Sequence, residues 1–295
     1  MRIPIFTDEA EQQGGWHGRV LAKAFRARGV EPVFVALQDC VIDLSDEIPR
    51  IKIPIFETNP RGAFVRGIAG GTLQQVITRL NILHILAMQG VKIYNDGRAI
   101  ERTVDKGMTS FLLKNAGIAT PPTWVCESRY HAHQIMSEQL PKTKLVIKPL
   151  FGSQGNGVRL LEQSSTYPVP MDAFVDGVYY LQQFVETGTK NHDFRVLVVN
   201  NRAAAAMQRS GDGWLNNVAQ GARCEAIEDK DILVLAVQAA KALNIDYCGV
   251  DIIRDKNGKL WVLEVNSIPA WAGLQSTVKI QVNQVLVDDF LSKLS

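Results

Sequence analysis

GVDIIRDKNGKLWVLEVN, residues 249–266, contains two extended runs joined by Asn257-Gly258, a dipeptide typical of tight hairpin turns. If these two residues alone form the turn, counting outward along both strands places Asp251 opposite Glu264. Opposed side chains lie about 4.5–5.5 Å apart at Cβ, where two like charges repel unless a cation lies between them. Asn266 projects from the same face as Glu264. The stretch therefore predicts a hairpin that presents three oxygen ligands on one face.

This set of oxygen ligands favours a metal site. Carboxylate and amide oxygens, together with phosphate oxygens, are the hard ligands that Mg²⁺ prefers. The alternative is a solvated hairpin face that carries its acids by chance. Asp251 and Glu264 both lie within apolar runs, which favours the metal site. A bulged turn would shift the register by one residue and weaken this interpretation.

A glycine-rich segment, LVIKPLFGSQGNGVRLL (residues 145–161), separates two further extended runs. Glycine lets backbone N–H groups approach a phosphate closely. The segment lacks the Gly-Lys-Ser/Thr ending of a P-loop and precedes a strand, so neither a P-loop nor a dinucleotide-binding turn fits. Lys148 lies in an apolar run, where an unpaired ammonium is unfavourable and an anionic partner is expected. We interpret the loop as a phosphate flap, with an ordinary glycine-rich hairpin as the alternative.

Other polar residues lie between these two segments, and each of them taken alone is usually an exposed surface residue without a function. Arg195 and Arg209 occur in runs that read as buried strands, where a guanidinium needs an anion such as phosphate. The remaining candidates are Lys106, the QQFVE run at residues 182–186, Asp193 and Asn217.

The periodicity of the whole chain predicts an α/β protein with three parts. Residues 1–96 alternate extended and helical segments, which predicts a parallel sheet covered by helices. Later strands are joined by links too short for crossover helices, so they must pair mostly antiparallel. Strands are expected at 3–6, 32–37, 51–56, 63–68, 91–95, 146–150, 157–161, 179–185, 194–199, 202–208, 249–254 and 259–266, and helices at 16–25, 73–83, 101–116, 229–243 and 276–293.

Composition excludes several classes of protein. Hydrophobic residues make up 46% and charged residues 21%, which is ordinary for a folded globular chain. The formal net charge of +2 provides no broad field for nucleic acid or an anionic membrane, so neither partner is expected. The N-terminus lacks an apolar run of signal length, which predicts a cytoplasmic protein. The four cysteines include no C-x-x-C pair and are interpreted as reduced core thiols.

Together these segments resemble the ATP-grasp superfamily and, within it, the RimK-like glutamate ligases. The matching stretches are VDKGMTSFLLKNAGIATPPTW, LVIKPLFGSQGNGV, YLQQFVE, HDFRVLVV and GVDIIRDKNGKLWVLEVNSIPA, which follow one another in the family's order between about residues 101 and 290. The resemblance implies an N-terminal pre-ATP-grasp α/β domain over residues 1–96, a central ATP-grasp lobe with the flap over 97–183, and a C-terminal lobe with the metal-binding hairpin over 184–295.

The resemblance also assigns roles to single residues. Gln183 stands where many relatives have Glu, so a side-chain contact to the adenine amino group is in question, whereas backbone contacts remain. The implied roles are nucleotide contact for Lys106 and Lys148; the phosphate flap for Gly152, Ser153, Gln154, Gly155 and Gly157; the adenine-lining hinge for Gln183, Phe184 and Val185; ribose binding for Asp193; phosphate or intermediate contact for Arg195 and Arg209; acyl-phosphate contact for Asn217; and Mg²⁺ (or Mn²⁺) binding for Asp251, Glu264 and Asn266.

The implied activity is ATP-dependent addition of L-glutamate to a small acidic acceptor through an acyl phosphate. Residues 14–29, 64–86 and 264–271 resemble ligases that glutamylate tetrahydromethanopterin-type or deazaflavin cofactors. Closely similar enzymes act instead on ribosomal protein tails or amino-group carrier proteins. Two further alternatives are an ATP-binding regulatory module without turnover and a grasp-fold kinase that stops at the phosphorylated substrate. A homo-oligomer, either a dimer or a tetramer, stays open.

Three residues of the first 96 are candidates for binding the acceptor. Arg66 lies inside the apolar run FVRGI, where its guanidinium fork suits a carboxylate. Trp16 and His17 begin the first expected helix, and an aromatic ring beside an imidazole could hold a flat ring by stacking. The alternatives are a structural ion pair for Arg66 and helix packing for Trp16.

Overall fold

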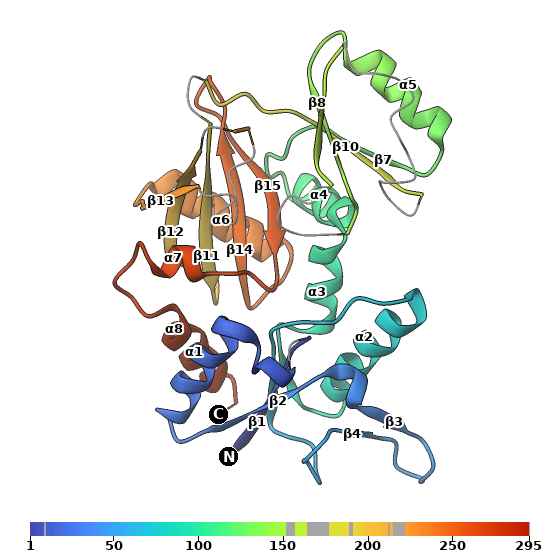
Figure 1. The fold of residues 1–295 in the computed structure, drawn as a ribbon, viewed down its shortest axis with the longest axis vertical. Coiled ribbons are helices and arrows are strands. Elements are labelled where there is room, and N and C mark those ends of the chain that lie inside the picture. Colours follow the sequence, from blue (N-terminus) through green and yellow to red (C-terminus); the bar gives the residue numbers. More distant parts are fainter. Residues whose placement is uncertain are drawn as a thin grey trace.

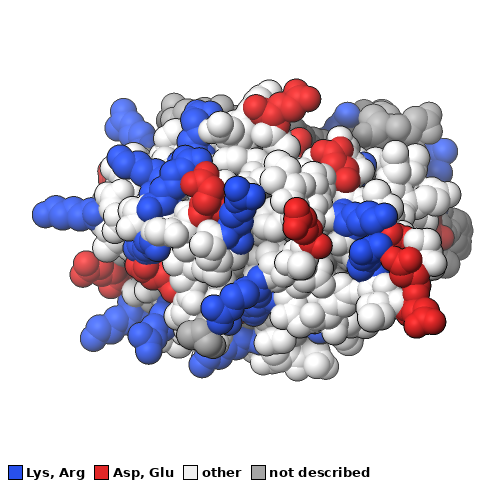
Figure 2. All heavy atoms as spheres, turned by 90° about the horizontal axis from the view of Figure 1, so that it is seen from below, with Lys and Arg blue, Asp and Glu red and all other residues white. Residues whose placement is uncertain are grey.

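Three lobes, each built around its own β-sheet, make up the computed structural model (Figure 1). The structure describes residues 1–8, 10–151, 157–163, 177–188, 191–211, 213–214 and 222–294. Among these residues, no helix is long and apolar enough to cross a lipid bilayer. Figure 2 views the molecule from the N-terminal lobe, where Lys and Arg side chains are interspersed with Asp and Glu, in keeping with the net charge of +2.

The N-terminal lobe contains the predicted parallel sheet, in the order β2-β1-β5-β6. Ile3 and Ile5 pack with helices α1 and α8, and Phe6 packs with α2, so helices cover both faces. The strand predicted over residues 51–56 ends at Lys52, because the chain then turns with Ile55 at a φ of 71°. The elements are β1 (Arg2–Phe6), α1 (Gly15–Arg26), β2 (Glu31–Val35), β3 (Val41–Asp43), β4 (Arg50–Lys52), β5 (Gly62–Val65), α2 (Leu73–Met88) and β6 (Lys92–Tyr94), with short 3-10 turns at Ala10–Gln12 and Leu37–Asp39.

Two helices replace the single helix predicted over residues 101–116. Helix α3 (Gly97–Val104) ends at Asp105, and α4 (Lys106–Asn115) begins directly after it. The Asp105 carboxylate accepts hydrogen bonds from the N–H groups of Gly107 and Met108, so it caps the second helix and breaks the first. Lys106 therefore stands in the first turn of α4.

The central lobe is an antiparallel sheet in the order β7-β10-β8-β9, as the short links predicted. Leu145, Ile147, Tyr179 and Leu181 point to one face, where they pack with helix α5. Residues of the opposite parity, including Lys148, therefore point to the other face. The elements are β7 (Thr123–Cys126), α5 (Arg129–Gln139), β8 (Leu145–Lys148), β9 (Arg159–Leu161) and β10 (Tyr179–Gln183).

The C-terminal lobe is an antiparallel sheet in the order β13-β12-β11-β14-β15. Helix α6 covers one face, where Val196, Val250 and Val262 are fully buried. The helix predicted over residues 276–293 is shorter, because α8 begins only at Val282 after a separate turn of helix, α7. The elements are β11 (His192–Val199), β12 (Arg202–Ser210), β13 (Arg223–Ala226), α6 (Lys230–Ala242), β14 (Tyr247–Arg254), β15 (Leu260–Asn266), α7 (Ala272–Gln275) and α8 (Val282–Ser292).

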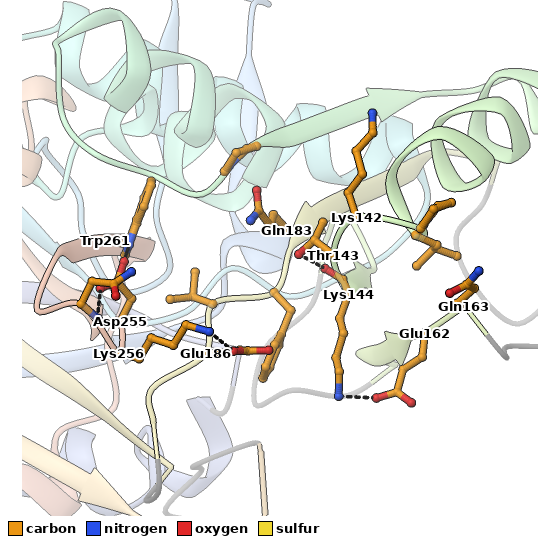
Figure 3. A pocket seen from close by; sticks show the side chains of 16 residues that line it. Lys142, Thr143, Lys144, Glu162, Gln163, Gln183, Glu186, Asp255, Lys256 and Trp261 are labelled. Carbon is orange, nitrogen blue, oxygen red and sulfur yellow. Dashed lines mark hydrogen bonds and ion pairs between the residues drawn. The ribbon is translucent and has the colours of Figure 1, made fainter.

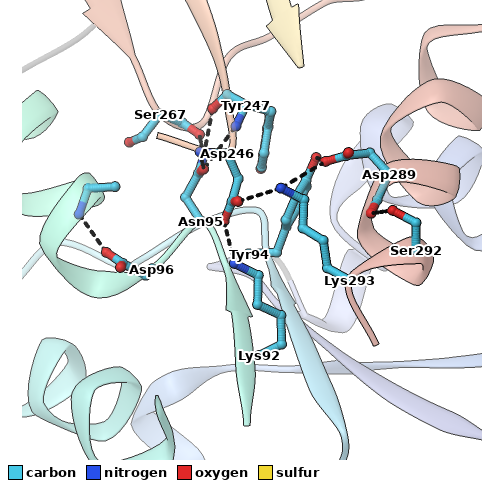
Figure 4. A network of polar contacts seen from close by, with 11 residues as sticks. Lys92, Tyr94, Asn95, Asp96, Asp246, Tyr247, Ser267, Asp289, Ser292 and Lys293 are labelled. Carbon is cyan, nitrogen blue, oxygen red and sulfur yellow. Dashed lines mark hydrogen bonds and ion pairs between the residues drawn. The ribbon is translucent and has the colours of Figure 1, made fainter. Parts of the chain in front are cut away.

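Asn95 joins the N-terminal lobe to the C-terminal lobe (Figure 4). Its side chain is fully buried and donates to the carbonyls of Tyr247 and Ser267, both at 2.7 Å. Its amide oxygen accepts from the N–H groups of Asp246 and Tyr247. A shared apolar core adds to this junction, because Phe64 of β5 and Phe290 of α8 pack in the same cluster as Leu197 of β11. The two lobes are therefore packed as one unit.

Candidate active site

The β14–β15 hairpin has the predicted pairing of Asp251 with Glu264, although its turn differs from the prediction. The loop contains three residues, because the Asp255 N–H donates to the Lys259 carbonyl, and Gly258 adopts a φ of 87°. This longer loop shifts the register by one residue near the turn. An irregularity between Asp251 and Ile252 shifts it back, so the acids are opposed after all.

Two arginines and two aspartates form a buried cluster on the same face of this sheet. Arg195 lies opposite Asp251, and Arg209 lies opposite Asp193. Arg195 donates to both carboxylate oxygens of Asp251, at 2.7 and 2.6 Å. Arg209, which is only 4% exposed, bridges Asp193 at 2.5 Å and Asp251 at 3.1 Å. Burial opposes ionisation of Asp251, but the two guanidiniums outweigh it and lower the pKa of Asp251.

Lys106 of α4 and Lys148 of β8 belong to the central lobe, and both interact electrostatically with Glu264 of the hairpin. Burial lowers the pKa of Lys148 to about 8, while the Glu264 carboxylate favours its charged form. Burial raises the pKa of Glu264, and the Asp251 carboxylate adds to this rise, whereas the charges of both lysines lower the pKa. The Lys148 ammonium donates to Gln182 Oε1 at 2.7 Å, and the Lys106 ammonium donates to the Leu150 carbonyl at 3.2 Å. Four cations and three acids from α4, β8, β11, β12, β14 and β15 thus converge.

The donor set on the hairpin fits a divalent cation. A carboxylate offers about four lone-pair positions, and the arginines occupy three of those of Asp251, which leaves one on Oδ2. A cation beside Glu264 would stabilise the charged form that burial disfavours. Asn266, paired with Gly249 two residues further along the ladder, adds an amide oxygen. Among the described residues, no group of three or more His, Cys, Asp and Glu side chains could hold a metal, so the set depends on this amide.

The predicted hinge lines a cavity of about 660 Å³ (Figure 3). Gln183, Phe184 and Val185 form one wall, and the loop at Lys256 and the ring of Trp261 lie on another side. The N–H groups of Gln183 and Phe184 donate to the carbonyls of Pro122 and Lys144, which fixes the path of the hinge. A volume of this size is in the usual range for small-molecule pockets.

Part of the predicted site falls outside the described residues. Gly157, directly after that part of the flap, has a φ of 72°, and a Cβ there would lie 2.8 Å from the Pro149 ring. Only glycine fits this position without strain. The predicted residues outside the described ranges are Gly152, Ser153, Gln154, Gly155 and Asn217.

The three N-terminal candidates gather around Trp271, just beyond the acidic hairpin. Arg66 stacks on the Trp271 ring, with 4.7 Å from its guanidinium carbon to the ring centroid, and donates to the Pro269 carbonyl at 3.2 Å. His17 Nε2 accepts a hydrogen bond from the Trp271 N–H at 3.0 Å. The rings of Trp16 and His17 are perpendicular, at 89°, so they do not form one stacking surface.

Two unsatisfied hydrogen-bond donors and the strand order of the N-terminal sheet both indicate a candidate ligand-binding position beside Trp271. Arg66 Nε and Trp271 Nε1 are buried without a hydrogen-bond partner among the described residues. Arg66 directly follows β5, beside the end of β1, as its N–H bonds to the Phe6 carbonyl. In the strand order β2-β1-β5-β6, the chain passes from β1 to β2 on one side of β1 and later returns to form β5 on its other side. Strands β1 and β5 therefore flank the switch point of the sheet, where ligands commonly bind.

Comparisons with known proteins identify the family and the fold of the chain. Residues 103–290 match the model of the RimK-like ATP-grasp domain, which is more than half of the chain. The chain belongs to the RimK-like ATP-grasp family. The tetrahydromethanopterin:alpha-L-glutamate ligase of Methanococcus maripaludis is 31% identical, covering 99% of this chain and 98% of the relative. A probable alpha-L-glutamate ligase of Vibrio vulnificus is 29% identical, covering 92% and 90%. The ATP-grasp ligase PsnB, solved with minimal precursor, Mg and ADP, shares the fold with a TM-score of 0.73 at 19% identity, covering 99% and 98%.

This membership confirms the predicted fold and enzyme class: the chain is an ATP-dependent ligase with the ATP-grasp fold. ATP-grasp ligases use ATP with a divalent metal. Gln182, the hydrogen-bond partner of Lys148, belongs to the candidate QQFVE run, but sequence reasoning gave it no role of its own and assigned the hinge to its neighbour Gln183. The available signal was a polar residue at a buried strand position, since Gln182 is only 2% exposed.

The ATP-grasp ligase should lose stability as the pH falls from about 6.5 toward about 4, partly through His17. Burial and, to a smaller extent, the charge of Arg66 together lower the pKa of His17 from 6.5 to about 4. The unfolded chain therefore binds a proton in this range that the folded chain does not, which favours unfolding, whereas above it neither form is protonated. Thermal unfolding of the wild type and His17→Gln at several pH values should show a shallower decline for the variant. Parallel declines would contradict this.

Proposed function

We propose that this ATP-grasp ligase joins L-glutamate to a small acidic acceptor, with a tetrahydromethanopterin-type pterin as the acceptor. The likeness over the full chain to the ligase of Methanococcus maripaludis supports this acceptor class. The observation that carries the chemistry is the convergence of Lys106, Lys148, Arg195 and Arg209 on the Asp251–Glu264 pair.

The reaction begins with activation of a carboxylate, which is a poor electrophile. The γ-phosphoryl group of ATP passes to a carboxylate oxygen of the acceptor, which forms an acyl phosphate and releases ADP. The glutamate amine then attacks the acyl carbon, the new amide loses a proton, and phosphate leaves. No side-chain nucleophile is needed, so the protein contributes positioning and charge neutralisation.

The charge of each residue determines its proposed role in the reaction. The four cations would neutralise the transferred phosphoryl group, and exclusion of water by the flap would protect the acyl phosphate. A bound Mg²⁺ (or Mn²⁺) would supply Lewis-acid stabilisation of the phosphate charge. We assign metal binding to Asp251, Glu264 and Asn266; the nucleotide to Lys106, Lys148, residues 152–157, Gln183, Phe184, Val185 and Asp193; phosphate or intermediate contacts to Arg195, Arg209 and Asn217; and the acceptor to Trp16, His17 and Arg66.

Product analysis tests the proposal. The protein should be incubated with ATP, Mg²⁺, glutamate and a metabolite extract rich in pterins, and the products analysed by mass spectrometry. A pterin that gains one glutamyl residue through an amide supports the proposal. A phosphomonoester would indicate a kinase, and a glutamylated protein without a modified pterin would overturn the acceptor class.

Arg66→Ala should raise the acceptor KM, or lower kcat/KM for the acceptor, by about 10–100-fold, because a charge-assisted hydrogen bond of roughly 1.5–3 kcal/mol is lost. The KM for ATP should stay nearly unchanged, since Arg66 stands beside Trp271 and not among the four cations. Steady-state kinetics with each substrate varied in turn measures both constants.

Arg61→Ala is the matched control, because Arg61 precedes the same strand at its opposite end and bonds to the Leu294 carbonyl. It should leave the acceptor kinetics unchanged. Unaltered acceptor kinetics in folded Arg66→Ala would reject the acceptor role, and equal losses for ATP and acceptor would indicate a structural role.

A further inference from the structure

A chain of buried hydrogen bonds ends on the Lys148 ammonium. Gln182 Oε1 accepts from Lys148 at 2.7 Å, and Gln182 Nε2 donates to Tyr180 Oη at 2.9 Å and to Thr123 Oγ1 at 3.1 Å. Tyr180 Oη is also 2.8 Å from Ser110 Oγ. These residues come from β10, β7 and α4, so three elements of the central lobe contribute to the position of one lysine.

The hydroxyl groups fix the orientation of the Gln182 amide. Thr123 Oγ1 donates its own hydrogen to the Pro121 carbonyl at 2.8 Å, so toward Gln182 it can only accept. The amide nitrogen must therefore face Thr123 and Tyr180, and the amide oxygen must face Lys148. A reversed amide would place its nitrogen against the ammonium, with donors opposed and two hydroxyl oxygens left without a donor.

A lysine side chain otherwise has considerable freedom, since it can adopt many rotamers. Contact with Gln182, together with the Tyr180 ring at 5.8 Å from the ammonium, removes much of this freedom before any ligand binds. A charge that is already in place loses less entropy when an anion arrives. Ser110 extends the chain to α4, whose first residue is Lys106.

We propose that Gln182 is a positioning residue, which holds the Lys148 ammonium in place for the phosphates of ATP through an amide oriented by Thr123 and Tyr180. This inference rests on the proposed nucleotide role of Lys148. It does not depend on the identity of the acceptor or on glutamate, because nucleotide binding can be measured without either.

A double-mutant cycle tests the proposal. Binding of a non-hydrolysable ATP analogue with Mg²⁺ should be measured by calorimetry for the wild type, Gln182→Met, Lys148→Met and the double variant. Gln182→Met should weaken binding by about 10-fold in the wild-type background and by less than about 2-fold in the Lys148→Met background. In assays of turnover, Gln182→Met should raise the KM for ATP without changing the KM for glutamate.

Two further variants make the cycle interpretable. Gln208→Met replaces a glutamine of β12, in the C-terminal sheet, and should leave nucleotide binding unchanged. Thr123→Val removes one of the groups that orient the amide and perturbs the core less, so it should weaken binding in the same direction if Gln182→Met fails to fold.

The outcomes distinguish the positioning role of Gln182 from the nucleotide role of Lys148. Equal losses from Gln182→Met in both backgrounds would show that Gln182 acts independently of Lys148, which overturns the positioning role alone. Unchanged binding in Lys148→Met would overturn the nucleotide role of Lys148 and the inference with it. Unchanged binding in both folded Gln182→Met and Thr123→Val would also overturn the inference.

Discussion

Glu264→Gln is expected to lower kcat by about 10³-fold or more and to leave a folded protein. The substitution keeps the shape of the side chain but removes the charge that Glu264 would contribute to the proposed metal site with Asp251 and Asn266. Stability should not fall, because burial and Asp251 already raise the pKa of Glu264, which means that the folded state disfavours its charge. Turnover is measured with ATP and saturating Mg²⁺, and folding by circular dichroism and thermal unfolding.

Glu225→Gln is the matched control for this experiment. Glu225 is an exposed residue of strand β13 at the edge of the same sheet, so its loss should affect neither rate nor stability. Wild-type rates in Glu264→Gln would show that the metal assignment is wrong. A variant that cannot fold would instead assign Glu264 a structural role.

Arg209→Met should destabilise the protein by about 3–5 kcal/mol, because it leaves two buried carboxylates without their shared cation. Arg209 bridges Asp193 and Asp251, and all three side chains are largely buried. Methionine preserves most of the side-chain volume, so the loss reports charge and hydrogen bonding more than packing. Urea unfolding followed by fluorescence measures the change as a shift in midpoint.

Arg254→Met provides the comparison, because Arg254 pairs with Asp229 at 2.7 Å but both side chains are about one-third exposed. An ion pair of this kind contributes about 0–1 kcal/mol, so the midpoint should hardly move. Equal shifts for the two variants would mean that the buried cluster contributes no more than a surface pair.

The hairpin shows what local sequence rules could predict here. Alternation and the Asn-Gly signal correctly predicted two paired strands with Asp251 opposite Glu264. The turn itself was predicted wrongly, because Asp255 accepts hydrogen bonds from the N–H groups of Asn257 and Lys259 and widens the loop. The irregularity beside Asp251 compensated for this error. Sequence periodicity indicates which face of the sheet a residue occupies. It does not reveal a longer loop and a bulge whose register shifts cancel each other.

Residues whose roles depend on side-chain hydrogen bonds were harder to predict. Asp105 looked like part of one helix, because only its side-chain hydrogen bonds show that it caps a second. Gln182 was part of the candidate QQFVE run but received no role of its own, since that role depends on Lys148 and Thr123 of other strands and on Tyr180 of the same strand. Pairing across separate strands is set by tertiary packing, which single-segment patterns do not contain.

The core shared between the N-terminal sheet and helix α8 has a consequence for folding during synthesis. Ile3, Ile5 and Phe25 pack with Leu286 and Phe290, so one face of the first sheet is covered only in part, by α1, until α8 has left the ribosome. At about 5–20 residues per second, translation of the intervening chain takes on the order of 10 s. During that interval part of an apolar sheet face is exposed, so non-native apolar contacts are most accessible while the central and C-terminal lobes are being made.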